Sequence, residues 1–586
     1  MSRGRRPRLP ASRAAPSLAQ PSVTNPRMAA LLAGLCFVVY LTNVRPMGGG
    51  DTIPARMLPF SILRQGNLDL NEFRWLTDVQ PIPYFLSCQP DGRCFSRYPV
   101  ALPLLITPIA APALWWVRAH GIADNDVRFR LMTVVVERLS AALIAAASVG
   151  CVFLGLCNVT SIRLAMWMTL AYGLGTSMWS IGSQALWQHG LAALAVAVTS
   201  LFLLRSDTPR NAFAAGLFGA LAVLARPTMV VFAFVAFVFM LRERRHHLWA
   251  FLGIPIIGGI LFAVYNARFT SVLSGAYGAI AFVWPQMSSL AGLLISPNRG
   301  LLVYTPAALL ALPTLVRPQT TVAPWIRYVR FGVLGYLILY SAWPGWWGGH
   351  VYGPRFLTDA LPVLVLCAIP TVERLWRHTA GRYLMLSLVV WGVAVQAIGV
   401  YCDDNGWNRL PLNVDNHPQR VWDWFDPQIL RAARAGWHGT DRLALLQQAL
   451  TDARPALLEV LNKEELTATI SIEDPLPLHF RPGASRTIPM RVTNNGNAMW
   501  PAYADWGLME CRLAHIWKAG DTVIHQGLFS ALPRNIGPGE SAVVQARVTA
   551  PEVPGNYELE SLVLQAVGWD RGAFGSPPIR VPVEVD

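Results

Sequence analysis

Apolar stretches separated by short polar connectors fill most of the chain up to residue 400. A helix needs about 20 mostly apolar residues to span a bilayer, and these stretches approach that length. The first covers residues 28–45. The later expected spans are 132–157, 164–180, 188–205, 212–224, 228–241, 248–265, 300–316, 331–343, 359–372 and 382–400. The pattern predicts a polytopic α-helical membrane protein with about eleven spans.

One apolar stretch differs from the others because prolines recur along it. The segment "YPVALPLLITPIAAPALWW" (98–116) carries Pro99, Pro103, Pro108 and Pro112. A proline inside a helix removes a backbone hydrogen bond, and unpaired backbone groups are unfavourable in lipid. We therefore expect a broken juxtamembrane helix that lies in the outer leaflet without crossing.

The basic connectors support this placement. If 98–116 does not cross, the arginine-rich connectors between the later spans, such as the one with Arg242, Arg244 and Arg245, all face the cytoplasm. If it does cross, they all lie outside, against the usual bias. With 98–116 not crossing, the N-terminus is cytoplasmic and the C-terminus extracytoplasmic. Arg226 follows the short span 212–224 and would sit below the membrane surface, where we expect it to face a wet cavity or an anion.

The chain divides by composition into four regions. Residues 1–27 read as a disordered basic cytoplasmic tail, and 28–400 as the transmembrane domain, with a first outer loop at 46–131. Residues 401–465 are a mixed helical linker. Residues 466–586 alternate apolar and polar positions in short runs between Pro/Gly turns, which predicts an extracytoplasmic β-sandwich of about seven antiparallel strands.

Charge and cysteine content narrow the class further. The formal net charge is +14, but the arginines lie between the apolar spans as topology signals, which argues against nucleic acid binding. Cys88 and Cys94 flank the turn sequence "QPDGR" and could close a hairpin in an oxidising compartment. Cys402 and Cys511 both fall outside the membrane, with no pairing readable from the sequence. No cysteine spacing resembles a zinc site.

Asp51 is the first candidate for chemistry. It lies in "GGGDTIPAR", directly outside the first span. One interpretation is an N-cap of the following helix. The other is a general base at the lipid–water boundary, which deprotonates a hydroxyl group arriving from water. The two interpretations are compatible. Arg56, in the same segment, is a candidate for substrate binding.

Two arginine motifs are candidates for holding a phosphate. Arg299 in "SPNRG" and Arg355 in "GGHVYGPRFL" lie among Gly and Pro residues next to apolar spans. A guanidinium group offers a planar, bidentate fork to a phosphate, although an arginine near an interface can also simply extend to water. His350 and Arg226 are the further candidates for this role.

Other polar and aromatic residues of the outer segments are candidates for substrate contact. Trp346 and Trp347 suit an aromatic wall or a membrane-interface belt, and the amide, indole and imidazole groups of "SQALWQHG" suit sugar hydroxyls and ring stacking. The candidate substrate-binding residues besides Arg56 are Asp69, Glu72, Tyr98, Gln184, Trp187, His189, Trp346, Trp347 and Tyr352. For Asp69 and Glu72 the alternative is a solvated turn and helix start.

Taken together, these features resemble the GT-C glycosyltransferase superfamily. The resemblance covers about residues 28–400: an aspartate after the first span, a long outer loop with juxtamembrane helices, short paired spans and a soluble C-terminal domain. The stretch "VTNNGNAMWP" begins a region similar to immunoglobulin-like modules. In the superfamily the early aspartate is the usual base, which corresponds to Asp51. Some members have two adjacent acids here, whereas Asp51 stands alone, and "SQALWQHG" lacks the acid of metal-dependent members.

The resemblance implies an inverting transfer of a sugar from a polyprenyl-phosphate donor to a hydroxyl group of a cell-envelope glycan, lipid or protein, at the periplasmic face of a bacterial inner membrane. It implies no cofactor, and a divalent metal is not supported by the residues present. The alternatives are a transporter, a glycan-assembly scaffold, or a polymerase or ligase that uses a diphosphate-linked glycan. A transporter would place ionisable groups at mid-membrane and often show internal repeats; no clear repeat is present.

Overall fold

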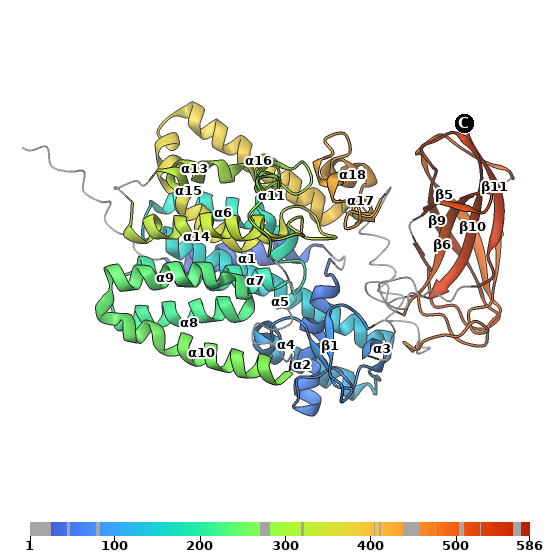
Figure 1. Cartoon of the computed structure of the whole chain (residues 1–586), viewed down its shortest axis with the longest axis horizontal. Helices are drawn as coiled ribbons and strands as arrows, with labels where there is room; N and C mark the ends of the chain where they lie inside the picture. The colour runs from blue at the N-terminus through green and yellow to red at the C-terminus, as the bar shows by residue number, and fades with distance from the viewer. Residues whose placement is uncertain are drawn as a thin grey trace, which may run out of the picture.

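A computed structural model describes residues 25–43, 47–77, 82–269, 282–317, 322–403, 405–409, 412–437, 457–474, 476–502, 509–527, 529–565 and 576–586. Figure 1 shows a large helical body and a β domain beside it, with the outer-loop elements α2, α3 and β1 at the end of the helical body that lies nearer the β domain. The expected combination of a helical membrane domain and a C-terminal β domain is therefore confirmed.

The expected spans coincide with helices. The long helices are α1 (Pro26–Leu41), α5 (Val127–Leu156), α6 (Ile162–Leu174), α7 (Gln188–Leu204), α8 (Pro209–Ala225), α9 (Val230–Glu243), α10 (Leu248–Phe269), α14 (Pro324–Ser341), α15 (Leu361–Trp376) and α16 (Thr379–Cys402). The span expected at 300–316 is interrupted, with α12 (Leu301–Tyr304), the 3-10 helix η6 (Pro306–Ala311) and α13 (Leu312–Val316) in succession.

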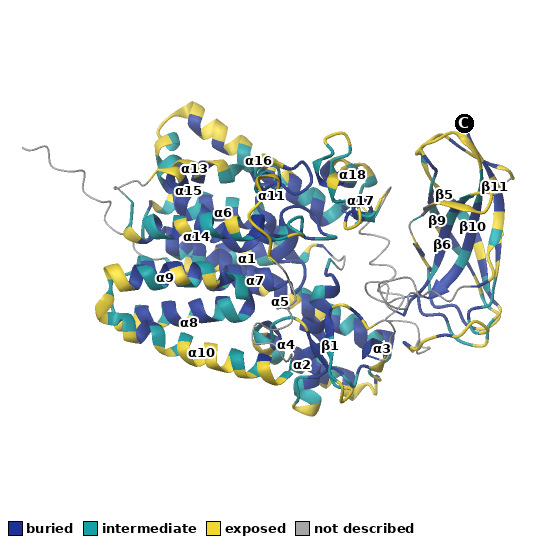
Figure 2. Ribbon diagram, in the orientation of Figure 1, coloured by how far each residue is buried: buried dark blue, intermediate teal, exposed yellow. Residues whose placement is uncertain are grey.

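Length and composition make these helices suitable for a membrane. Within the described residues, five helical stretches are long and apolar enough to cross a bilayer, and they are Ala101–Ala119, Val127–Leu156, Arg245–Phe269, Arg355–Trp376 and Thr379–Cys402. The first of these is the proline-rich segment, which the sequence does not count among the spans. Large apolar side chains also cover the outer surface of the body, as on α10, where Ile256, Ile257, Ile260 and Val264 are exposed (Figure 2). Exposed apolar surface on this scale is stable in lipid and unfavourable in water. The chain is a multi-pass membrane protein.

The proline-rich segment forms one continuous helix, α4 (Ala101–Ala119), so the expectation of a broken helix is wrong. Pro103 lies in the first turn, where backbone N–H groups have no helical partner in any case, while Pro108 and Pro112 are accommodated inside. In Figure 1, α4 is seen almost end-on whereas α8, α9 and α10 run across the view. α4 therefore runs at a steep angle to α8, α9 and α10. Its expected place in the outer leaflet stays a prediction.

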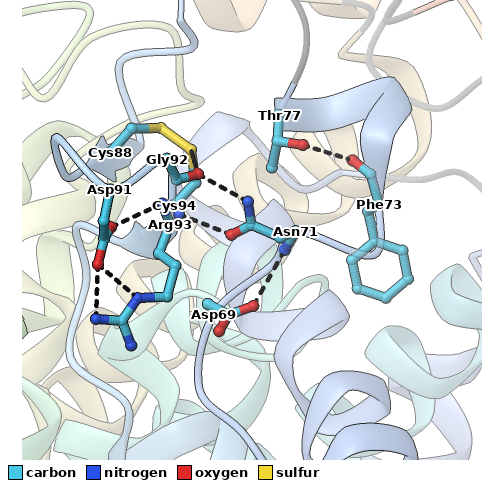
Figure 3. The surroundings of a disulfide bond; sticks show 9 residues. All are labelled: Asp69, Asn71, Phe73, Thr77, Cys88, Asp91, Gly92, Arg93 and Cys94. Atoms are coloured by element: carbon cyan, nitrogen blue, oxygen red, sulfur yellow. Dashed lines mark hydrogen bonds and ion pairs between the residues drawn. A yellow bond between two sulfur atoms is a disulfide. The ribbon is translucent and has the colours of Figure 1, made fainter.

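The loop between α1 and α4 contains several short elements. They are the 3-10 turn η1 (Gly50–Thr52), α2 (Ile53–Gln65), α3 (Arg74–Thr77), β1 (Leu86–Cys88) and β2 (Cys94–Ser96). The two strands pair antiparallel, and Cys88 and Cys94 form the disulfide that the turn sequence suggested (Figure 3).

The region after residue 400 is only partly helical. It contains α17 (Gly406–Arg409), the 3-10 helix η8 (Pro418–Trp422) and α18 (Gln428–Ala435). Most of the helical sequence expected around 441–461 lies outside the described residues. The described part packs on α16 and on the loop segments around Asn298 and Gly349.

The β domain consists of two sheets. One has the strand order β4 (Leu478–Phe480), β11 (Ile579–Val585), β10 (Gly555–Gln565), β6 (Cys511–Ala519) and β7 (Thr522–Gln526), and β8 (Ser530–Ala531) also pairs with β6. The other contains β3 (Ala468–Ile472), β5 (Ser485–Asn494) and β9 (Ser541–Thr549). The pairing departs from the antiparallel expectation at one point, because β4 runs parallel to β11. Trp500 and Trp517 are fully buried in this domain.

A short extended segment, 457–461, contacts both bodies. The N–H of Leu458 donates to the carbonyl of Asn125 at 2.7 Å, just before α5 begins. Gln565 of β10 donates to the carbonyl of Glu459 and accepts from the N–H of Leu461. The β domain is thereby linked to the start of α5.

Candidate active site

The chain leaving α1 is fixed by an arginine of α5. Arg138 donates to the carbonyl oxygens of Tyr40 at 3.0 Å, Asn43 at 2.8 Å and Gln184 at 2.6 Å. The Gln184 side chain in turn accepts a hydrogen bond from Asn43 at 2.9 Å and is fully buried. Gln184, which we expected to contact substrate, therefore ties the end of α1 to the segment before α7.

The helix that follows the aspartate is anchored by a buried ion pair. Arg56 of α2 lies 3.2 Å from Glu137 of α5, and both side chains are at most 2% exposed. Glu137 also accepts the N–H of Leu186 at 3.1 Å. Arg56, a candidate for substrate binding, is therefore paired with Glu137 inside the protein.

These anchors place Asp51 at the meeting point of three distant segments. Its Oδ1 accepts hydrogen bonds from the hydroxyl groups of Tyr84 at 2.7 Å and Tyr98 at 2.6 Å. Its Oδ2 accepts from Nη1 of Arg355 at 2.9 Å. Arg355 begins the 3-10 helix η7 (Arg355–Ala360), 304 residues further along the chain. The Asp51 and Arg355 side chains remain 19% and 13% exposed, so solutes can reach the pair.

The partners of Asp51 determine its ionisation. Burial on its own would raise the pKa of the carboxyl group, but Arg355 and the hydroxyl groups of Tyr98 and Tyr84 outweigh burial and hold the pKa below its usual value. Asp51 is therefore an ionised carboxylate at neutral pH and can accept a proton or a hydrogen bond from a hydroxyl group.

Arg355 keeps most of its hydrogen-bonding capacity. Its guanidinium lies 4.7 Å from the ring centroid of Trp187, which supports the cation from one side. Among the described residues its only hydrogen-bond acceptor is Asp51, and its Nε is buried without an acceptor. Several N–H groups are thus available to a further anion.

A buried polar cluster fixes the helix that carries Arg355. Asp359 of η7 lies 2.8 Å from Nδ1 of His189 and 3.1 Å from Nε of Arg226, and it accepts a hydrogen bond from Tyr336. Arg226 also donates to Tyr340 of α14. The anion expected opposite Arg226 is therefore a carboxylate of the protein itself, and Arg226 and His189 join α7, α8 and α14 to η7.

Arg299 differs from Arg355 in that its donors are all occupied. It is 1% exposed and donates five hydrogen bonds. The acceptors are the carbonyl oxygens of Asn298, Trp347 and Gly349 and the side chains of Asn408 and Gln428. Arg299 therefore holds the loop 344–350 against the region after residue 400, and no donor remains for a phosphate in this conformation.

The remaining candidates of the 344–358 loop have different surroundings. Trp347 donates its indole N–H to Asp415 at 3.0 Å, and Nε2 of His350 lies 3.0 Å from Asn413 Oδ1. Burial lowers the pKa of His350, so this imidazole is neutral at pH 7. Tyr352 is buried and donates to the carbonyl of Val395.

Trp346 packs against the α11 helix (Met287–Ile295), where a Cβ on Gly292 would come within 2.1 Å of its ring. Trp346, Trp347 and His350 are all half-buried, whereas Tyr352 is buried.

Asp69 and Glu72 lie in the turn beside the disulfide hairpin. Asp69 accepts the N–H of Asn71 at 3.3 Å, as expected for a turn residue (Figure 3). Burial raises the pKa of Glu72. Neither residue contacts Asp51 among the interactions of the described residues.

Sequence reasoning missed three acidic or phenolic residues. Tyr84 contacts Asp51, Asp359 orients η7, and Asp415 pairs with Trp347. A signal for Tyr84 was present: Tyr84 in "PIPYF" and Tyr98 in "SRYPV" stand symmetrically, four residues before Cys88 and four after Cys94.

An apolar cavity of about 280 Å³ adjoins this site. Its walls come from the start of α4, from α8 and from α10, with Leu104, Leu224 and Phe262 among the lining residues. Tyr98, whose hydroxyl group contacts Asp51, is also one of the lining residues.

The chain is similar in fold to several solved structures. ArnT from Cupriavidus metallidurans bound to undecaprenyl phosphate aligns with a TM-score of 0.42 and 15% identity, covering 72% of this chain and 71% of that chain. The apo form of ArnT aligns with a TM-score of 0.41 and 15% identity, covering 72% of this chain and 70% of that chain. The apo oligosaccharyltransferase of Archaeoglobus fulgidus aligns with a TM-score of 0.39 and 11% identity, covering 73% of this chain and 58% of that chain.

No protein-family model and no curated protein matches the sequence. Identities this low concern the fold alone and specify neither a donor nor an acceptor for this chain.

Proposed function

We propose that the protein is an inverting glycosyltransferase that moves a sugar from a polyprenyl-phosphate donor to an acceptor hydroxyl group. Asp51 accepts the proton of the acceptor hydroxyl group as its oxygen attacks the anomeric carbon of the sugar. The bond from that carbon to the phosphate oxygen breaks, and Arg355 stabilises the charge that develops on the departing lipid phosphate. A single attacking group and no covalent intermediate give inversion.

The Asp51–Arg355 pair is the observation that carries this proposal. An ionised carboxylate and a guanidinium with open donors lie 2.9 Å apart and are both partly exposed. The carboxylate is suited to a hydroxyl group, and the guanidinium to a phosphate. A purely structural ion pair would be expected to satisfy its remaining donors, as Arg299 does.

The adjoining apolar cavity is suited to the lipid chain of the proposed donor. It opens between a juxtamembrane helix and two spans, and apolar side chains dominate its lining. An isoprenoid chain in this cavity would have its phosphate next to Tyr98 and the Asp51–Arg355 pair. Undecaprenyl phosphate, the ligand of one of the ArnT structures, is a compound of this class.

The proposed orientation follows from the same elements. The site and the β domain lie at one end of the bundle and the arginine-rich connectors at the other (Figure 1). The positive-inside bias then places the site and β domain in the periplasm, and the N-terminus in the cytoplasm, of a bacterial inner membrane. The disulfide in the first outer loop is in keeping with an oxidising compartment. The β domain would then be available to an envelope glycan, lipid or protein acceptor.

The test is a transfer assay with the purified full-length chain in lipid nanodiscs, against a panel of polyprenyl-phosphate sugars and envelope acceptors. We expect turnover by the wild type and a loss of at least about 10³-fold for Asp51→Asn, because the amide cannot accept the proton. Asp521→Asn is the matched control, since Asp521 is an exposed residue of the β domain.

The outcomes separate the proposal from its alternatives. Equal turnover by Asp51→Asn and wild type would remove Asp51 as the base. Turnover only with diphosphate-linked glycans would identify a polymerase or ligase instead. Uptake of a glycan into sealed vesicles without any new glycosidic bond would identify a transporter.

A further inference from the structure

The hairpin closed by Cys88 and Cys94 lies between the two tyrosines that contact Asp51. Counting from the disulfide, Tyr84 is four residues before Cys88 and Tyr98 four residues after Cys94. The strands pair in register from Cys88↔Cys94 to Leu86↔Ser96, and the N–H of Arg97 donates to the carbonyl of Phe85 at 2.9 Å. The two arms leave the hairpin side by side and end with both hydroxyl groups on the same carboxylate oxygen.

The disulfide end of the hairpin is also docked on the loop body. Asn71 donates to the carbonyl of Gly92 and accepts the N–H of Cys94, each at 2.8 Å (Figure 3). The N–H of Leu70 donates to the carbonyl of Cys94 at 2.9 Å. These contacts require Gly92 and Cys94 to stay in the tight turn that the disulfide closes.

A hairpin of this size depends on its cross-link. A ladder of three residue pairs is marginally stable by itself, and a disulfide restricts the conformations that the opened chain can adopt. Tyr98 has further support because α4 begins at Ala101, three residues later. Tyr84 is the tyrosine that depends more on the hairpin.

We propose that the Cys88–Cys94 disulfide positions Tyr84 and Tyr98 on Asp51, so that sugar transfer depends on the redox state of this cysteine pair. Reduction by a dithiol breaks the Sγ–Sγ bond, and two electrons and two protons convert the cysteines to thiols while the dithiol becomes a disulfide. The hairpin then opens, and Asp51 loses the hydroxyl groups that fix its orientation. The proposal rests on the proposed function, because it concerns the same carboxylate.

The experiment compares transfer by the full-length protein in nanodiscs before and after dithiothreitol treatment. We expect the transfer rate of the wild type to fall about tenfold or more on reduction, which is the scale of one hydrogen bond to a charged group. The rate should recover on reoxidation. Cys88→Ser/Cys94→Ser should be equally slow under both conditions. The control Cys511→Ser should keep the wild-type response, because Cys511 lies in the β domain outside any disulfide.

A second pair of variants separates positioning from general loosening. Tyr84→Phe/Tyr98→Phe should be slow and no longer respond to dithiothreitol, because the groups that the disulfide positions are gone. A further loss on reduction of this variant would show that the hairpin acts elsewhere and would overturn the proposal. Unchanged transfer by the reduced wild type would overturn it as well.

Two readouts do not require turnover. Maleimide mass-tagging of the denatured, non-reduced chain should leave Cys88 and Cys94 unlabelled, and hydrogen–deuterium exchange should rise across residues 84–98 on reduction. If the oxidised wild type transferred no sugar from any donor, the proposed function would fail, and unchanged exchange across 84–98 would separately overturn the positioning role.

Discussion

Arg355 and Arg299 differ in the acceptors that surround each guanidinium. Arg299 is enclosed by five acceptors, whereas Arg355 has Asp51 and the face of Trp187. A guanidinium with open donors can bind an incoming anion, and one with filled donors stabilises the fold. The two arginines should therefore respond to substitution in opposite ways.

Arg355→Gln should lower kcat/KM for the donor by about 10²–10³-fold with little change in Tm, because it removes the group that stabilises the leaving phosphate. Arg299→Gln should instead reduce the stability by about 2–3 kcal/mol, since buried acceptors lose their partners. Steady-state kinetics and thermal unfolding in detergent measure the two effects. A lower Tm for Arg355→Gln with normal turnover would reverse the assignment.

The pH dependence of transfer should reflect the ionisation of Asp51. Its pKa is lowered by Arg355 and by both tyrosines, so the wild type should keep its activity as pH falls until the usual range of an aspartate has been passed. Tyr98→Phe removes one of these stabilising contacts, which raises the pKa and moves the acid limb of kcat/KM to higher pH. Profiles of kcat/KM that extend below pH 4, where the wild-type acid limb is expected, test this, and superimposable acid limbs would contradict it.

Two residues of the candidate site, Asp51 and Arg355, were predicted from the sequence, and the structure brings them together. Asp51 and Arg355 could be found because both flank apolar spans at the same end of the bundle. Arg299 looked equivalent to Arg355, since each lies among Gly and Pro residues, and only tertiary contacts with Asn408 and Gln428 distinguish them. Those partners come from a region that reads as a linker, so no local pattern could reveal them.

At the scale of elements, the hydrophobic pattern located the spans because lipid requires long, continuous apolar segments. The pattern was less informative about α4, where proline positions suggested a break that the helix does not have. It also gave no sign of the interruption between α12 and η6 at Thr305. The short outer elements depend on specific contacts, such as the ion pair of Arg56 and Glu137, which no periodicity encodes.

The turn between α1 and α2 depends on a close approach that only glycine allows. A Cβ on Gly49 would lie 2.6 Å from the Trp187 ring that supports Arg355. Gly49→Ala should displace this ring and lower the transfer rate about tenfold. It should also lower the free energy of unfolding by about 1–3 kcal/mol, because the added methyl group overpacks the site. Gly34→Ala is the matched control, because nothing lies within 4 Å of its added Cβ. Transfer assays and Tm values decide, and equal activity of the two variants would contradict the expectation.

At the scale of the whole molecule, the proposal requires that Asp51, Arg355 and the β domain share one side of the membrane. The described contacts fit this, because segment 457–461 links the β domain to Asn125 at the start of α5, at the same end of the bundle as the loop that carries Asp51. The position of α4 is decisive, since a membrane crossing at 101–119 would place every later connector on the opposite side of the membrane.

Cysteine labelling tests this topology. His120→Cys, just after α4, should react with a membrane-impermeant maleimide in intact spheroplasts, because position 120 is exposed and expected outside. His246→Cys, also exposed, should react only after permeabilisation. The unsubstituted chain is the control for native thiols. Labelling of both positions from the same side would refute the arrangement.

The pairing of Asp51 with Arg355 also bears on the sequence of binding events. A donor phosphate would compete with the carboxylate for the same cation, and any hydrogen bond given to the phosphate weakens the hold on Asp51. The carboxylate would then become more basic at the moment when the activated sugar arrives, and would stay weakly basic in an empty site. Such coupling favours an ordered reaction in which the lipid donor binds before the acceptor hydroxyl group is deprotonated.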